Sequence, residues 1–431
     1  MKIVMNPIRP AMHEGSDDFH VLIRLQSEPQ ADFKRTPLNL ALVIDRSGSM
    51  AGSKLEEAKR CVIDLVERMN LLDKVGLVQY DNTIDTVMPL TAVEQARGVL
   101  TAMVSCITAG ANTNLHAGWL RGSEMLAPKA GGDEACHVIL LSDGQANEGV
   151  VDTTAICHQV AALAGAGVTT TTVGLGVDFN EELMTAMAKA GQGNAHYGER
   201  AIDLAETFEA EIGMLSQLQW RSVEFSVTQG PSEFEVLNAY ERTPSGWRLP
   251  SVAMGSECWV LLRIPLQAAL RSQREHGTVL TIEVRATDAS GERQIFGGQL
   301  PSLPEVSSFD YDALVPHELV QRRIHELAAA RLQLQIRDAA LRGDWLHAEA
   351  LLRELEVLGR HEPWVAASIA FARQLLRDRD ELRMSKEMLY KSHKMQQRLS
   401  STDESLFSAT EQYEMPAFLR RKMTEGRRTE S

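Results

Sequence analysis

Strand-like and helix-like segments alternate over residues 37–218, and this alternation constrains the fold more than any other feature of the sequence. Residues 38–44 form a nearly continuous apolar run, which is typical of a strand buried on both faces. Apolar residues then recur at helical spacing from Leu55 to Met69. Because strands that alternate with helices build βαβ units, the pattern predicts an α/β fold with a doubly wound, mainly parallel sheet and helices on both faces.

The same alternation continues to the end of this region. Further strands are expected at residues 75–78, 84–90, 137–141 and 168–175. Further helices are expected at residues 115–126, 153–165, 180–190 and 203–218. Together these elements define one predicted domain over residues 37–218.

The chain on either side of this region has a different pattern. Residues 219–310 alternate between apolar and polar with turn signals between the runs, which predicts an antiparallel β domain. Residues 1–36 hold a short alternating strand that is expected to pair with this β domain, so the α/β domain would be inserted in it. Residues 311–393 return to helical spacing, and the break at Arg342-Gly343-Asp344 predicts a helical hairpin. Residues 394–431 are polar and are predicted to be a flexible tail.

Composition excludes several classes of protein. With 44 Lys and Arg against 58 Asp and Glu the chain has a net charge of −14, which argues against a nucleic-acid partner bound by bulk charge. The sequence contains no run of about 18 apolar residues, so no membrane span is predicted. The N-terminal residues lack the apolar core of a signal peptide, and the five cysteines show no CxxC spacing. These features predict a cytoplasmic protein with reduced thiols.

Oxygen-bearing side chains follow the predicted strands of the α/β domain. Asp45, Ser47 and Ser49 come directly after the first strand, and Asp143 follows the strand at 137–141. Thr113 lies in the turn that opens the helix at 115–126. Because open α/β sheets bind ligands beyond the carboxyl ends of their strands, these side chains are expected to converge at one edge. Carboxylates and hydroxyls are the donors that a hard cation such as Mg²⁺ prefers.

This set of residues closely resembles a known family. The pattern Asp45-x-Ser47-x-Ser49, then Thr113, then Asp143-Gly144 is similar to the von Willebrand factor A domain with its metal-ion-dependent adhesion site. The whole chain also resembles bacterial cytoplasmic proteins in which this Rossmann-like domain is embedded in a β domain and followed by helices. The resemblance implies that hydroxyls of Ser47, Ser49 and Thr113 bind Mg²⁺, or Mn²⁺ or Ca²⁺, directly.

The resemblance also implies a function. Asp45 and Asp143 would hold waters on the ion, and one coordination position would stay open for an Asp or Glu carboxylate of a partner protein. We therefore expect a non-enzymatic, metal-dependent protein–protein interaction module. Arg46, between the first two motif residues, is expected to point outward towards the partner.

Two other functions stay open at this point. A metal-dependent phosphohydrolase would use the same ion to activate water, but no adjacent general base or nucleophile is apparent in the motif. A scaffold or self-assembling protein would use the tail, one of whose carboxylates would reach the metal site of a neighbouring copy and give a homo-oligomer. These tail carboxylates are Asp403, Glu404, Glu411 and Glu414.

Overall fold

The protein is described by a computed structural model in which two compact units are distinguished. The structure describes residues 1–13, 15, 18–28, 35–176, 179–198, 201–359, 363–379, 381–397 and 400–401. Residues 32–222 and 288–292 make up one unit, called here the α/β unit. Residues 1–31, 223–287 and 293–431 make up the other, called here the β–helix unit. The α/β unit is thus inserted into the sequence of the β–helix unit.

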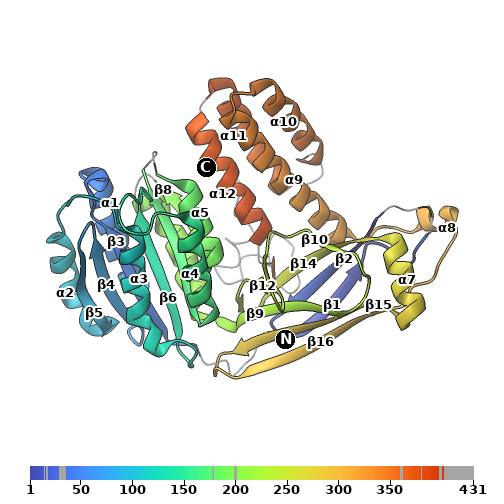
Figure 1. Ribbon diagram of the computed structural model, residues 1–431, viewed down its shortest axis with the longest axis horizontal. Helices are drawn as coiled ribbons and strands as arrows, with labels where there is room; N and C mark the ends of the chain where they lie inside the picture. The colour runs from blue at the N-terminus through green and yellow to red at the C-terminus, as the bar shows by residue number, and fades with distance from the viewer. Residues whose placement is uncertain are drawn as a thin grey trace, which may run out of the picture. The chain divides into compact units, whose positions relative to one another are not determined.

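A six-stranded sheet forms the centre of the α/β unit (Figure 1). Its strands, in spatial order, are β5 (Ile84–Ala92), β4 (Lys74–Tyr80), β3 (Leu38–Asp45), β6 (Ala135–Ser142), β7 (Val168–Leu175) and β8 (Gln192–Gly198). All neighbouring pairs are parallel except β4 and β5. The predicted α/β fold with a mainly parallel sheet is therefore confirmed.

Six helices cover the two faces of this sheet. They are α1 (Ser53–Arg68), α2 (Val93–Ser105), α3 (Leu115–Leu126), α4 (Thr153–Gly165), α5 (Glu181–Ala190) and α6 (Ala201–Ser216). Leu40, Leu42 and Ile44 of β3 pack in one apolar cluster with residues of α1, α2 and α6. Ala41 and Val43, which point the other way from the strand, face α3. Burial on both faces explains why β3 is a continuous apolar run.

Glycines let helix α3 pack closely against the sheet. A Cβ atom added at Gly118 would overlap the ring of Tyr80, and one added at Gly122 would overlap the side chain of Val43. The two glycines therefore allow the helix axis to approach β3 and β4. This approach sets the position of Thr113, which comes two residues before α3 begins.

Two antiparallel sheets form the first part of the β–helix unit. One contains β1 (Lys2–Pro7), β2 (Asp18–Gln26), β14 (Ser256–Pro265) and β10 (Glu235–Val236), and β17 (Ser400–Ser401) adds to β14. The other contains β11 (Glu241–Thr243), β12 (Gly246–Leu249), β9 (Leu218–Gln229), β15 (Thr278–Asp288) and β16 (Arg293–Pro301), and β13 (Val252–Ala253) pairs with β9. Strand β2 pairs with β14 along its whole length, so the N-terminal segment joins this antiparallel part of the chain.

The antiparallel region also holds a helix, α7 (Leu266–His276). The sequence predicted an antiparallel β domain for this stretch and did not reveal this helix. Buried residues such as Leu266, Ala269 and Leu270 give α7 one apolar face. Gly277 ends the helix in the left-handed conformation, with φ +71°.

The C-terminal helical region contains more than the expected hairpin. After a short α8 (Ser308–Ala313), it consists of α9 (Glu318–Leu341), α10 (Trp345–Gly359), α11 (Pro363–Asp378) and α12 (Glu381–Gln397). The turn between α9 and α10 contains Gly343, with φ +71°. Residues 394–397, assigned from sequence to the tail, extend α12. Residues 398–399 and 402–431 of the predicted tail lie outside the described residues.

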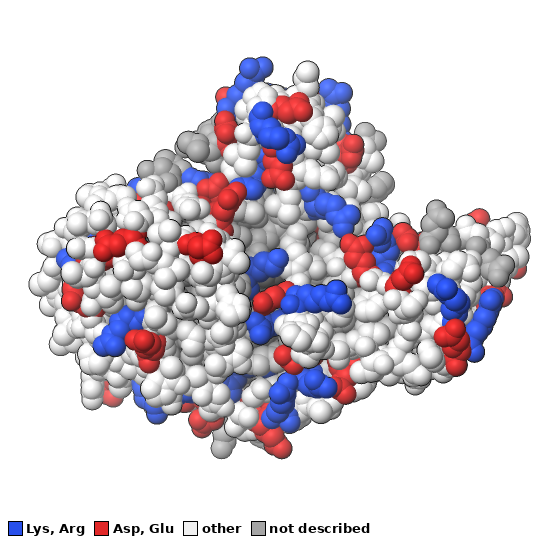
Figure 2. Space-filling view, in the orientation of Figure 1, with Lys and Arg blue, Asp and Glu red and all other residues white. Residues whose placement is uncertain are grey.

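Charged side chains of both signs are mixed on one face of the molecule. On the face drawn in Figure 2, acidic and basic residues are interspersed and do not separate into one acidic and one basic region. In the part of the chain that the structure describes, no helix has both the length and the apolarity needed to span a membrane.

Candidate metal centre

Three segments meet at the carboxyl edge of the parallel sheet. The loop after β3 is joined to the end of β4, because Arg46 N donates to Tyr80 O at 2.9 Å. The same loop is joined to the segment before α3 through Gly48 N to Ala111 O, at 2.8 Å, and Gly110 N to Arg46 O, at 2.6 Å. These backbone bonds hold the Asp45–Ser49 loop against the segment that leads to Thr113.

Asp45 is the buried centre of the site. It ends β3 next to Ser142, the last residue of β6. Its Oδ1 accepts from Ser47 N at 2.8 Å, and its Oδ2 accepts from the hydroxyls of Ser142 at 2.5 Å and Tyr80 at 3.2 Å. Burial raises the pKa of Asp45 to about 6, although the hydrogen bonds from Ser142 and Ser47 oppose the shift; the negative charge of Asp143 adds to it. A nearby cation would relieve this unfavourable burial of charge.

Two serine hydroxyls lie beside this carboxylate. Ser47 Oγ and Ser49 Oγ are 3.1 Å apart. Ser47 is fully buried, whereas Ser49 is exposed. The pair therefore runs from the interior of the site to the surface.

Thr113 is fixed by the segment that follows β6. Its N donates to Asn147 Oδ1 at 2.8 Å, and its carbonyl oxygen accepts from Asn147 N at 3.1 Å and Glu148 N at 3.2 Å. Asn147 belongs to the segment after β6, so this segment holds the third predicted hydroxyl in place. Thr113 itself is buried.

Asp143 is the second buried carboxylate. Its Oδ1 accepts from Gln145 N at 3.4 Å, and its carbonyl oxygen accepts from Asn180 N at 2.9 Å. Lys54 Nζ lies 3.5 Å from Asp143 Oδ2 and places a positive charge at the site. Gly144 follows with φ +66°, a conformation that favours glycine.

Arg46 differs from its expected orientation. Its Nη2 atom lies 3.2 Å from Asp81 Oδ2 and donates to Thr83 Oγ1 at 3.0 Å. The guanidinium also approaches Thr108 O at 3.5 Å. The side chain is therefore mostly buried and connects the loops after β3 and β4, so the expectation that it points outward towards a partner is wrong.

The site depends on residues that the sequence did not single out. Tyr80 and Ser142 donate to Asp45, Asn147 holds Thr113, and Lys54 approaches Asp143. The Asp45–Tyr80 pair becomes visible only through the register of β3 and β4, in which these two residues are opposite each other. Ser142 carried a usable signal, since it immediately precedes Asp143.

The donor chemistry of the site fits a hard divalent cation. The five predicted residues offer three hydroxyls and two carboxylates, all of them oxygen donors. Over the described ranges, no group of three or more His, Cys, Asp and Glu is placed to hold a metal ion. A metal at this edge would therefore depend on hydroxyl oxygens. The role of the five residues as metal ligands stays a prediction.

Comparison with known proteins identifies the domain that carries this site. Residues 39–210 match the family model for the von Willebrand factor type A domain. Residues 39–210 form a von Willebrand factor A domain. Domains of this family commonly mediate protein–protein interactions, and many of them bind a divalent metal at the adhesion site.

The arrangement around the von Willebrand factor A domain also recurs in other proteins. An uncharacterised protein of Synechocystis sp. is 26% identical over 338 residues, which is 74% of this chain and 78% of that protein. A von Willebrand factor type A structure from Catenulispora acidiphila aligns with a TM-score of 0.68 at 16% identity, covering 90% of this chain and 96% of that one. The ArnB paralog VWA2 from Sulfolobus acidocaldarius aligns with a TM-score of 0.59 at 17% identity, covering 91% and 97%. At these identities the two structures show a shared fold.

Proposed function

We propose that the von Willebrand factor A domain is a metal-dependent protein-binding module. A divalent cation would be held by hydroxyls of Ser47, Ser49 and Thr113, with Asp45 and Asp143 holding its coordinated waters. The ion would bind an Asp or Glu carboxylate of a partner protein. The observation that carries this proposal is the fully buried Asp45 carboxylate, which accepts from Ser47 N next to the paired hydroxyls of Ser47 and Ser49.

The donor set explains why a partner carboxylate would be captured. Hydroxyl oxygens are neutral, so an ion bound mainly through them keeps most of its positive charge. A carboxylate that approaches from outside then meets an undercompensated cation, and charge-assisted contacts of this kind are strong. The exposed Ser49 marks the side from which it would approach.

The neighbouring groups favour binding over catalysis. Asp45 accepts three hydrogen bonds, from Ser47, Tyr80 and Ser142, so about one of its four lone pairs is left to accept from a coordinated water, and the carboxylate is fixed in position. His116, near Thr113 in the sequence, is buried and lies 2.8 Å from Gln159 through its Nε2. We therefore infer that the module has no reaction of its own and that a phosphohydrolase is disfavoured.

The setting and the cation are also proposals. None of the five cysteines, all of which the structure describes, forms a disulfide bond, which fits a reducing compartment such as the cytoplasm. The Synechocystis relative aligns with 74% of this chain, and we infer a bacterial protein of the same type. Among oxygen-preferring cations we favour Mg²⁺, with Mn²⁺ and Ca²⁺ as alternatives.

Calorimetric titration with Mn²⁺ and Mg²⁺ tests the site itself. Wild type is expected to bind one ion, and Ser47→Ala is expected to lower the affinity at least about 10-fold by removing one direct oxygen donor. Ser53→Ala is a matched control, because this exposed serine lies in the first turn of α1. Equal affinities for all three proteins would contradict the proposal.

Acetate then serves as the simplest carboxylate probe. With Mn²⁺ bound, ¹³C-labelled acetate is expected to show hyperfine coupling to the ion in wild type, as a directly coordinated carboxylate does. Turnover of a chromogenic phosphate ester that is lost in Asp45→Ala would instead establish the hydrolase.

A further inference from the structure

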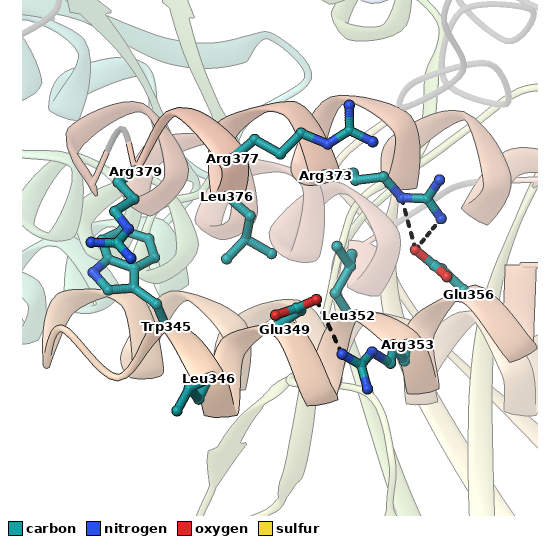
Figure 3. Close-up of a pocket in the computed structure, with 10 residues that line it drawn as sticks. All are labelled: Trp345, Leu346, Glu349, Leu352, Arg353, Glu356, Arg373, Leu376, Arg377 and Arg379. Carbon is teal, nitrogen blue, oxygen red and sulfur yellow. Dashed lines mark hydrogen bonds and ion pairs between the residues drawn. The ribbon is translucent and has the colours of Figure 1, made fainter.

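A groove between α10 and α11 lies outside the metal centre and has no role in the proposed function. Its volume is about 580 Å³, within the range of small ligand and peptide sites (Figure 3). Apolar side chains of Trp345, Leu352 and Leu376 form part of its lining, and Leu352 is almost fully buried. Four arginines and two glutamates make up most of the remaining lining.

The charges of the groove do not balance. Arg373 Nε donates to Glu356 at 3.1 Å across the two helices, and Arg353 pairs with Glu349 on α10 at 3.1 Å. Arg377 and Arg379 are exposed, and no ion pair involves either of them among the residues that the structure describes. Two guanidinium groups are therefore available beside an apolar surface.

The backbone at Arg379, at one end of the groove, has an unfavourable conformation. Arg379 follows α11 with φ +50°, in the left-handed region that glycine or asparagine usually occupies after a helix. A side chain with a Cβ costs about 1 kcal/mol in this conformation. The strained position nevertheless carries an arginine, and its side chain lines the groove (Figure 3).

The chain carries a segment with complementary chemistry. Residues 402–415 contain four acidic residues and no Lys or Arg. They also contain apolar side chains suited to the groove lining, namely Leu406, Phe407, Tyr413 and Met415. We propose that residues 402–415 bind in the α10–α11 groove of the same chain, with Glu411 and Glu414 facing Arg377 and Arg379.

The length of the chain permits this contact. The described residues end at Ser400–Ser401, which pair with β14. Helix α12 begins two residues after Arg379 and has 17 residues, so its ends are about 25 Å apart at 1.5 Å per residue. Glu414 is 13 residues beyond Ser401, and at about 3.3 Å per residue the chain can span about 43 Å to it. The segment can therefore return along α12 to the groove.

A polyanion such as nucleic acid is a poorer occupant. Two of the four arginines pair with Glu349 and Glu356, so the groove lacks the row of uncompensated cations that a continuous phosphate backbone needs. The apolar lining also offers nothing to a sugar–phosphate backbone. A peptide that carries both apolar and acidic residues satisfies both parts of the lining.

Hydrogen exchange on the full chain tests this contact. In wild type, amides of residues 402–415 are expected to exchange at least about 5-fold more slowly than in an unstructured peptide of the same sequence. Arg377→Glu combined with Arg379→Glu is expected to remove that protection. Arg271→Glu is the matched control, since Arg271 is an exposed arginine of α7 in the same unit and should leave the protection unchanged.

Exchanging the charges of the segment and of the groove distinguishes a lost contact from a loss of folding, because the combined variant should restore the contact. Glu411→Arg with Glu414→Arg should lose protection in the native groove and regain it when combined with Arg377→Glu and Arg379→Glu. Absence of protection in wild type, or protection that survives the groove variants, would overturn the proposal. So would protection that requires Mg²⁺ and Ser47, which would place the segment at the metal centre, or protection that rises with protein concentration, which would require a second copy.

Discussion

The charge of Asp45 predicts a specific pH dependence of stability in metal-free protein. Burial raises the pKa of this carboxyl from 3.8 to about 6, so the folded state holds the proton more tightly than the unfolded state does. The ionised carboxylate therefore destabilises the folded state fully at pH 7.5. This destabilisation decreases as the pH falls through 6, and it is gone below 3.8, where the unfolded chain is protonated as well. Asp45→Asn lacks this titration and provides the reference.

The size of the effect follows from the two pKa values. At pH 5 the folded protein is mostly protonated at Asp45, while the unfolded chain is mostly ionised. Wild type should then gain about 1.4 kcal/mol in free energy of unfolding relative to Asp45→Asn between pH 7.5 and pH 5. Urea denaturation of both proteins at the two pH values, in the presence of a chelator, measures this difference.

The comparison removes contributions from other titrating groups, because both proteins share them. Asn also changes the hydrogen bonds from Tyr80 and Ser142, but those changes alter stability equally at both pH values. A stability difference that is constant with pH would refute the reasoning. Adding Mg²⁺ at about ten times its Kd should stabilise wild type at pH 7.5 by about 1.4 kcal/mol, and should leave Asp45→Asn unchanged.

Three further predictions concern other positions. Gly122→Ala should lower the free energy of unfolding by about 1–3 kcal/mol in urea, because the added methyl overlaps β3; an unchanged midpoint would show that α3 can move away at little cost. Lys54→Met should tighten Mn²⁺ binding in calorimetry several-fold, since Lys54 Nζ lies 3.5 Å from Asp143 and competes with the ion; weaker binding would contradict this. Arg323→Met should destabilise the chain by about 3 kcal/mol in thermal unfolding, because the buried Glu326 loses its bond from Arg323 at 2.9 Å; a loss below 1 kcal/mol would show that Arg322 compensates.

The sequence predicted those helices and strands whose buried side chains are apolar. Strand β3 is buried at every position, and its run of apolar residues identified it within one residue of its observed end. Helix α3 was predicted with its observed bounds, since one of its faces is apolar. Helix α2 was missed although Val93, Ala96 and Leu100 show helical spacing and are buried, so its signal was present in the sequence.

Strand β8 could not be predicted in the same way, because its interior is polar. Asn194 Nδ2 donates to Glu211 Oε2 at 2.5 Å, and His196 Nε2 lies 3.4 Å from the same oxygen. Thr171 of β7 donates to the other oxygen of Glu211 at 2.8 Å. One buried carboxylate from α6 thus replaces the apolar contacts by which a strand is usually recognised.

The sequence named the five oxygen-bearing residues of the candidate site, whose role as metal ligands stays a prediction, but it did not reveal the residues that hold them in place. The five oxygen-bearing residues follow directly from strand ends and from the family pattern. The roles of Tyr80 and Arg46 depend on which strands are neighbours and on the direction of the side chains. Local sequence predicts neither the strand order nor these directions. Arg46 shows the consequence, because an arginine expected at the binding surface instead bonds to Thr83 and contacts Asp81.

The most direct test of the central claim is the anomalous scattering of a crystal grown with Mn²⁺. We expect one strong peak at the carboxyl edge of the parallel sheet, with hydroxyl oxygens of Ser47, Ser49 and Thr113 at about 2.0–2.2 Å, a distance expected for a small hard cation. Asp45 and Asp143 should contact the ion through water. No peak at saturating Mn²⁺, or a peak bound by other residues, would contradict the account.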